Sequence, residues 1–150
     1  MPRLDAERIG LLRRLSATTS TITRRIDADL VDEFDLPLAW FEVMASLARH
    51  GGAMRVSELC VDLDEIPSSL SRRLDRMEEQ GLVEREATPA TSGTTTSDRR
   101  AVTVTLTKAG RAFWRDANVV YRRAVQRHFA QVVTDSDITA LHRLLSKLDP

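Results

Sequence analysis

The chain has 150 residues, 42% of them hydrophobic and 29% charged, and its 22 basic side chains balance 22 acidic ones. This length fits one compact domain or two small packed ones, and no apolar run approaches the roughly 20 residues of a transmembrane helix. The acidic, polar beginning predicts no secretory signal, and the single cysteine, Cys60, excludes an internal disulfide, so we expect a cytoplasmic protein.

The balanced charge hides an uneven distribution along the chain. Residues 1–66 carry 8 basic and 12 acidic side chains (net −4), residues 67–115 carry 9 and 6 (net +3), and residues 116–150 carry 5 and 4 (net +1). An anion-binding surface must therefore be local, and the middle segment is where we expect it.

The first segment predicts a long helix from about Asp5 to Glu33, because leucine and isoleucine recur at steps of three and four residues. Its apolar stripe has few candidate partners in so short a chain, which predicts burial against another subunit. Pro37 separates it from a second helix, which we expect to run from Leu38 to about His50, before two glycines.

The middle segment predicts two shorter helices separated by a turn. The first has Ser57 as its expected N-cap, and the second runs from Pro67 to Glu79 and stops at Gly81. On this second helix the expected buried stripe is Leu70, Leu74 and Met77. The polar side chains fall on the opposite face, at about 100° per residue.

Beyond Gly81 apolar residues recur at every second position, which predicts strands. One strand spans 82–85, the other Ala101–Leu106, and a polar low-complexity stretch separates them, so the pair reads as a long hairpin. Thr107 is the expected N-cap of a helix over about 108–133. A last helix starts at Thr134, with Asp137 completing a capping box, and carries a strong leucine stripe.

A short helix, a turn, a second helix and a hairpin together form a winged helix-turn-helix, so the predicted fold is mainly α with a two- or three-stranded β wing. The predicted DNA-binding side chains of the second helix are Ser68, Ser69, Ser71, Arg72 and Arg76. Arginine bonds guanine edges or phosphates, and serines near a helix start bond phosphates. The hairpin adds Arg99 and Arg100, which suit a minor groove, beside Asp98, which can hold an arginine in one rotamer.

These residues resemble the MarR family of bacterial transcriptional regulators. The stretches that carry the resemblance are Val56–Cys60, Ser68–Arg85, Asp98–Arg100 and Leu106–Gly110. The family implies a homodimer joined through residues 1–36 and 111–150, with residues 37–110 as the DNA-binding region. It also implies a helix in the major groove, Arg100 of the wing in the minor groove with Asp98 orienting it, and a ligand-modulated repressor on a pseudo-palindromic operator.

The chain departs from the family pattern in two places. Asp98 follows Arg85 by 13 positions, so the wing tip carries extra residues, roughly 91–97. Ile66 stands where a capping serine or threonine is usual, and we expect Asp64 or Glu65 to compensate.

Each candidate residue also has a structural interpretation. Arg72 and Arg76 could form ion pairs with neighbouring acids on a solvated helix face. Cys60 is more consistent with a buried core residue than with a redox sensor. Trp40 and Met44 fit a core, but by resemblance to the family they could also line a pocket for a small aromatic or phenolic effector.

No catalytic motif, phosphate-binding loop or metal-ligand spacing is present in the sequence, so we expect no enzymatic activity, no cofactor and no metal. The predicted partners are double-stranded operator DNA and a second copy of the chain, with no membrane. The alternative is a winged-helix module that binds another protein and no specific DNA. Salt-sensitive retention on specific DNA separates the two functions.

Overall fold

The structure is a computed structural model that describes residues 5–88 and 101–148. It divides into two compact units, one made of residues 1–35 with 119–150 and the other of residues 36–118. Each unit is described by itself below.

The first unit is helical. It contains α1 (Ala6–Phe34), the end of α5 (Lys108–His128), a 3-10 turn, η1 (Ala130–Val132), and α6 (Asp135–Leu148). The carboxylate of Asp5 caps α1 by accepting the backbone N–H of Arg8 at 2.9 Å, and Asp35 ends the helix with a left-handed φ of +50°. The predicted helix over this segment is confirmed.

Ion pairs join α1 to the end of α5. The carboxylate of Asp29 accepts Arg127 at 3.2 Å and His128 at 2.9 Å, and Glu33 pairs with Arg123. The helix α5 ends at His128, so the prediction that it continues to residue 133 is wrong. The reason is local, because Phe129 leaves helical geometry at φ −138° and ψ −64°.

The capping box predicted for α6 is present. The hydroxyl of Thr134 accepts the N–H of Asp137 at 3.3 Å, while the Asp137 carboxylate accepts the N–H of Thr134 at 3.0 Å. Hydrogen bonds from Thr134 hold the pKa of the Asp137 carboxyl below its ordinary value. Two unpaired groups at the helix start are thus satisfied reciprocally.

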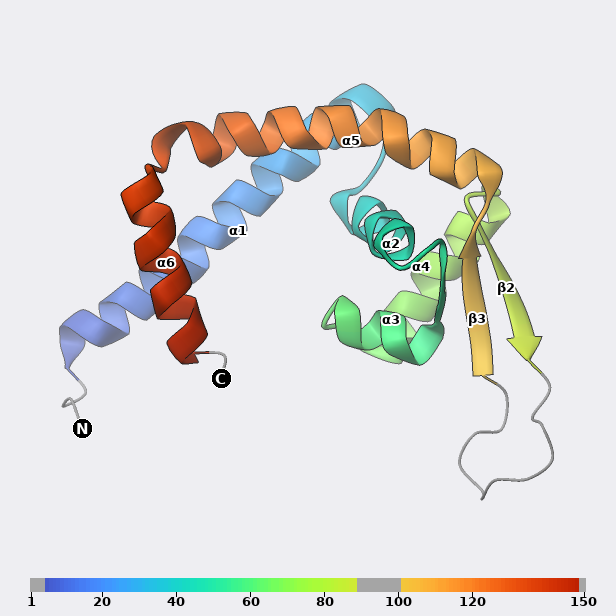
Figure 1. Ribbon diagram of the computed structural model, residues 1–150, viewed down its shortest axis with the longest axis horizontal. Helices are drawn as coiled ribbons and strands as arrows, with labels where there is room; N and C mark the ends of the chain where they lie inside the picture. Colours follow the sequence, from blue (N-terminus) through green and yellow to red (C-terminus); the bar gives the residue numbers. More distant parts are fainter. Residues whose placement is uncertain (1–4, 89–100, 149–150) are drawn as a thin grey trace, which may run out of the picture. The chain divides into compact units, whose positions relative to one another are not determined.

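The second unit is a three-stranded winged helix-turn-helix. Its elements are α2 (Leu38–Arg49), β1 (Ala53–Arg55), α3 (Val56–Asp62), α4 (Pro67–Glu79), β2 (Val83–Thr88), β3 (Ala101–Leu106) and the start of α5. The strands are antiparallel in the order β1-β3-β2, with Met54 opposite Val104 and Val83 opposite Leu106. Figure 1 shows α2, α3 and α4 on one side of the strands. The predicted bounds of α4 and β3 are confirmed, whereas β2 starts one residue later and ends three residues later than predicted.

The core of this unit lies between the helices and the sheet. The predicted stripe of α4, Leu70, Leu74 and Met77, is fully buried. Further fully buried apolar side chains of the unit come from α2, α3, β2 and β3: Val43, Met44, Leu47, Leu59, Val83 and Val104. Burying each of the larger side chains contributes about 1.5–3 kcal/mol, which fixes α4 with its polar face outward.

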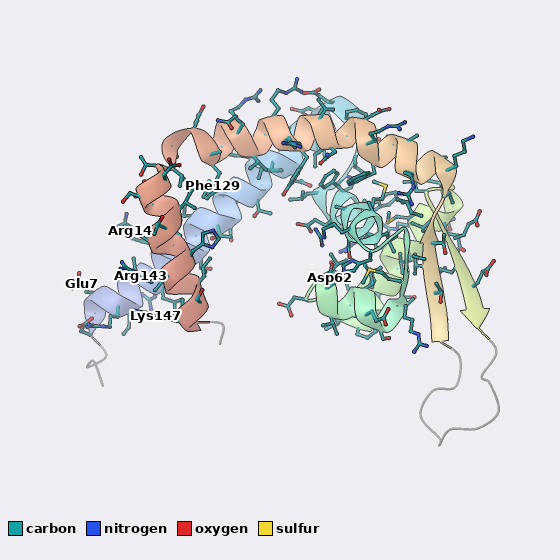
Figure 2. All side chains as sticks on the ribbon, in the orientation of Figure 1. Glu7, Arg14, Asp62, Phe129, Arg143 and Lys147 are labelled. Carbon is teal, nitrogen blue, oxygen red and sulfur yellow. The ribbon has the colours of Figure 1, made fainter. Side chains whose placement is uncertain are left out.

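A buried hydroxyl joins α2 to α3. Ser46 is fully buried and donates to Oδ2 of Asp62 at 2.5 Å, and Arg49 donates to the same oxygen at 3.0 Å. The hydrogen bond from Ser46 is the largest cause of a lowered pKa at Asp62. Figure 2 shows Asp62 at the end of α3.

Two predicted helix caps are wrong. The helix α3 begins at Val56, with Arg55 and not Ser57 at the cap position, because β1 continues in extended geometry up to Arg55. The helix α4 has no side-chain cap at Ile66, so neither Asp64 nor Glu65 compensates. Glu65, in the turn before α4, instead forms an ion pair with Arg73 of that helix. Pro67 removes one of the N–H groups that a cap would have satisfied.

Thr107 is the N-cap of α5, as predicted, and it also bonds the turn that follows α4 at Gly81. Its hydroxyl accepts the N–H of Gly110 at 2.9 Å and donates to the carbonyl of Gly81 at 2.6 Å. Gly110 packs directly on the backbone of Leu82, where an added Cβ would lie 2.0 Å from the carbonyl oxygen. A close backbone contact therefore joins α5 to the chain that links α4 and β2.

Candidate nucleic-acid interface

The exposed face of α4 carries the side chains that the sequence identified. All five lie on the surface, opposite the buried leucines: Ser68, Ser69, Ser71, Arg72 and Arg76. The serines lie in the first turns, where unpaired backbone N–H groups and the positive end of the helix dipole favour anions. The face therefore presents hydrogen-bond donors that suit the acceptor oxygens of phosphates and the acceptor atoms of base edges.

Neither Arg72 nor Arg76 forms an ion pair with any residue that the structure describes. Asp75, the expected intrahelical partner, instead accepts Arg85 of β2 at 2.5 Å. The alternative interpretation, a helix face neutralised by its own ion pairs, therefore does not describe these two arginines. Their guanidinium groups are available to an external anion.

A surface hollow of about 500 Å³ adjoins this face. Its lining residues come from α2, from the turn before α4 and from α4 itself: Trp40, Ile66, Ser68, Ser69, Arg72, Arg73 and Arg76. The sequence suggested Met44 together with Trp40 as pocket residues. Met44 is fully buried in the core of the unit and does not line this hollow. An indole beside three guanidinium groups can hold a flat anion.

Sequence reasoning missed a contact between the sheet and α4. Arg85 donates from its backbone N–H to Oε1 of Glu78 at 3.0 Å and from Nε and Nη2 to Oε2 at 3.1 and 2.7 Å, besides its bond to Asp75. We call Arg85, Asp75 and Glu78 the Arg85 clamp. Hydrogen bonding with Glu78 raises the pKa of Arg85, and the same bond is the main cause of a lowered pKa at Glu78. Opposite charges at 75, 78 and 85 were the only signal in the sequence.

The predicted wing residues Asp98, Arg99 and Arg100, and the extended tip over 91–97, lie outside the described residues. Cys60 is described, and its side chain is buried. Burial, followed by the nearby charge of Glu65, raises the pKa of the Cys60 thiol, which keeps it protonated at neutral pH. This environment is that of a core residue and not of a reactive cysteine.

Among the residues that the structure describes, no group of three or more histidine, cysteine, aspartate or glutamate side chains is placed to hold a metal ion. Within residues 5–88 and 101–148, no helix is both long enough and apolar enough to cross a membrane.

Comparison with known proteins gives one consistent result. A sequence model of the MarR family matches residues 34–92. The transcriptional regulator PecS of Dickeya dadantii is 28% identical, over 99% of this chain and 85% of its own length. AbsC of Streptomyces coelicolor, a MarR family regulator, superposes with a TM-score of 0.81 at 26% identity, covering 99% of this chain and 95% of its own.

A structure of a mutant MarR from E. coli complexed with operator DNA superposes with a TM-score of 0.79 at 27% identity, covering 99% of this chain and all of its own. The winged helix-turn-helix, the exposed polar face of α4 and these similarities agree. The chain is thus similar in sequence and in fold to DNA-binding transcriptional regulators of the MarR family.

Proposed function

We propose that the chain is a cytoplasmic, ligand-responsive repressor that binds a pseudo-palindromic operator as a homodimer. In this proposal α4 enters the major groove, and Arg100 of the wing, oriented by Asp98, enters the minor groove with Arg99 beside it. The observation that carries the proposal is the free cationic face of α4, since Arg72 and Arg76 are exposed and without ion-pair partners among the described residues.

Exposed leucines support the homodimer. On α1, Leu11 and Leu12 are 61% and 69% exposed, and on α6, Leu145 and Leu148 are 53% and 65% exposed. An apolar stripe of this kind on a single chain is typical of a surface that a second chain covers. Two-fold symmetry then predicts operator half-sites about one helical turn apart.

The surface hollow beside α4 supports a small aromatic or phenolic effector. Trp40 offers an aromatic face, and Arg73, which pairs with Glu65, also lines the hollow. Because Arg72 and Arg76 also line the hollow, an effector bound there would occupy two of the proposed DNA contacts. Binding of effector and of DNA would then be mutually exclusive, and the effector concentration relative to its dissociation constant would determine how far operator occupancy falls.

The test begins with selection of bound fragments from the host genome and continues with single variants of α4. If Arg72 or Arg76 reads a base edge, its alanine variant loses about 1–3 kcal/mol on the selected operator and becomes less selective at one base pair. If it contacts only phosphate, the loss of affinity is similar on every duplex. The slope of log binding constant against log salt concentration then falls in magnitude by about one. Arg25→Ala, which removes an exposed charge from α1, is the matched control.

Unchanged operator affinity in both Arg72→Ala and Arg76→Ala would refute the assignment of α4 as the reading helix. Failure of the wild-type chain to retain any specific duplex at low salt would favour the winged-helix module that binds protein. Asp98→Ala and Arg100→Ala test the wing in the same assay. We expect similar losses in each and little additional loss in the double variant, because the two residues act as one unit.

A further inference from the structure

The Arg85 clamp has a geometry that stability alone does not require. Arg85 lies in the middle of β2, the strand that leads into the wing, and its side chain is 23% exposed. It reaches two carboxylates on α4, one of which, Asp75, is 54% exposed. A single exposed ion pair contributes little to stability, yet here one guanidinium forms hydrogen bonds with two acids while its own backbone N–H bonds Glu78.

The position of Asp75 explains why such a contact matters for DNA. Asp75 immediately precedes Arg76 and follows Arg72 by three residues, so it borders the cationic face of α4. A carboxylate released there could pair with Arg72, three residues earlier on the helix, and would repel phosphate. With Asp75 held by Arg85, both arginines stay unpaired within the described part of the chain.

The clamp also sets where the wing begins. The backbone bond and the two guanidinium bonds to Glu78 fix β2 at Arg85 against the last turns of α4. A strand fixed at this point gives the wing a defined direction from the helix. Forked hydrogen bonds of this kind specify geometry as well as charge, which a lysine ammonium cannot reproduce.

We propose that Arg85 is a positioning residue for operator binding, which acts through Glu78 and Asp75 and contacts no base itself. It holds the start of the wing on α4 and keeps Asp75 away from Arg72. This inference rests on the proposed function, in which α4 and the wing bind the same operator.

The experiment compares two changes of opposite charge. Arg85→Ala removes one positive charge, whereas Asp75→Asn/Glu78→Gln removes two negative ones, and both break the clamp. We expect both to weaken binding to the selected operator by about tenfold, and the triple variant to be no weaker than either. On a short duplex of arbitrary sequence the two should diverge, because binding there follows charge: Arg85→Ala weakens it and Asp75→Asn/Glu78→Gln strengthens it.

Two further variants separate positioning from charge and from folding. Arg85→Lys keeps the charge but not the fork, so it should restore binding to the arbitrary duplex and not the operator affinity. Glu86→Gln, on the same strand but outside the clamp, is the control and should leave the ratio of the two affinities unchanged. Thermal unfolding of every variant identifies a loss that follows from misfolding.

The proposal is overturned if Asp75→Asn/Glu78→Gln tightens operator binding as much as it tightens binding to the arbitrary duplex, since the carboxylates would then only repel DNA. It is also overturned if Arg85→Ala leaves operator affinity unchanged, or if Arg85→Lys restores it fully. Silent Arg72→Ala and Arg76→Ala variants would refute the proposed function instead, so the two failures are distinguishable.

Discussion

Gly110→Ala is the substitution whose effect the structure determines most directly. The added Cβ would lie 2.0 Å from the carbonyl oxygen of Leu82 and 2.9 Å from its carbon, whereas a relaxed carbon–oxygen contact is at least about 3.3 Å. The backbone must therefore move by more than about 1 Å. Overpacking of this kind costs about 1–3 kcal/mol, and the same carbonyl accepts the N–H of Thr107 at 3.1 Å, a bond worth about 0.5–1.5 kcal/mol.

Alanine is the better helix former by up to about 1 kcal/mol, which offsets part of this cost. We expect a net loss of about 0.5–3.5 kcal/mol and, for a chain of this size, an unfolding midpoint lowered by about 1–14 °C. The matched control is Ala109→Gly at the neighbouring exposed position, which should lose no more than the propensity difference. Differential scanning calorimetry measures both. A Gly110→Ala variant as stable as the wild type, or more stable, would show that helix propensity outweighs the contact with Leu82.

Three further predictions follow from burial and charge. Leu144→Asp should lower folding together with assembly, because the two would be coupled in the proposed homodimer, and a compact folded wild-type monomer in sedimentation at micromolar concentration would contradict this. Cys60 should react with a thiol reagent much more slowly in the native chain than in urea, and equal rates would show that the thiol is accessible. Because the pKa of Glu78 is lowered in the folded chain, the clamp stabilises above the ordinary carboxyl range and is lost as pH falls through the lowered value. Glu78→Gln should therefore flatten the fall of the unfolding midpoint below about pH 4, and parallel curves for variant and wild type would refute it.

The elements that the sequence predicted best are those with strong local signals. Pro67 and Gly81 bracket α4, and strict alternation marks β3, so these bounds agree with the structure. Strand β1 has three residues, too few to show a period, and its extension to Arg55 also displaced the expected cap of α3. The early end of α5 depends on one backbone conformation at Phe129, for which no residue type in the sequence was a signal.

The candidate site also has one part that the sequence predicted and one part that it did not. The exposed face of α4 was predictable because burial of three apolar side chains determines which residues point outward. The clamp was not, since Arg85 meets Glu78 and Asp75 only after β2 folds against α4, and the sequence equally allowed Asp75 to pair with Arg72 on the same helix. Met44 is fully buried in the single chain, and its place in an effector pocket stays a prediction.

The buried hydroxyl of Ser46 constrains the order in which related sequences can change. Losing Ser46 first leaves Asp62 with Arg49 and with solvent, since the Asp62 side chain is 28% exposed. Losing Asp62 first leaves a fully buried hydroxyl whose nearest remaining partner is the sulfur of Met54 at 3.4 Å, a weak acceptor. An unsatisfied buried donor costs about 1–3 kcal/mol, while removing both groups can be nearly neutral. Lineages that abandon this link between α2 and α3 should therefore lose the serine before the aspartate.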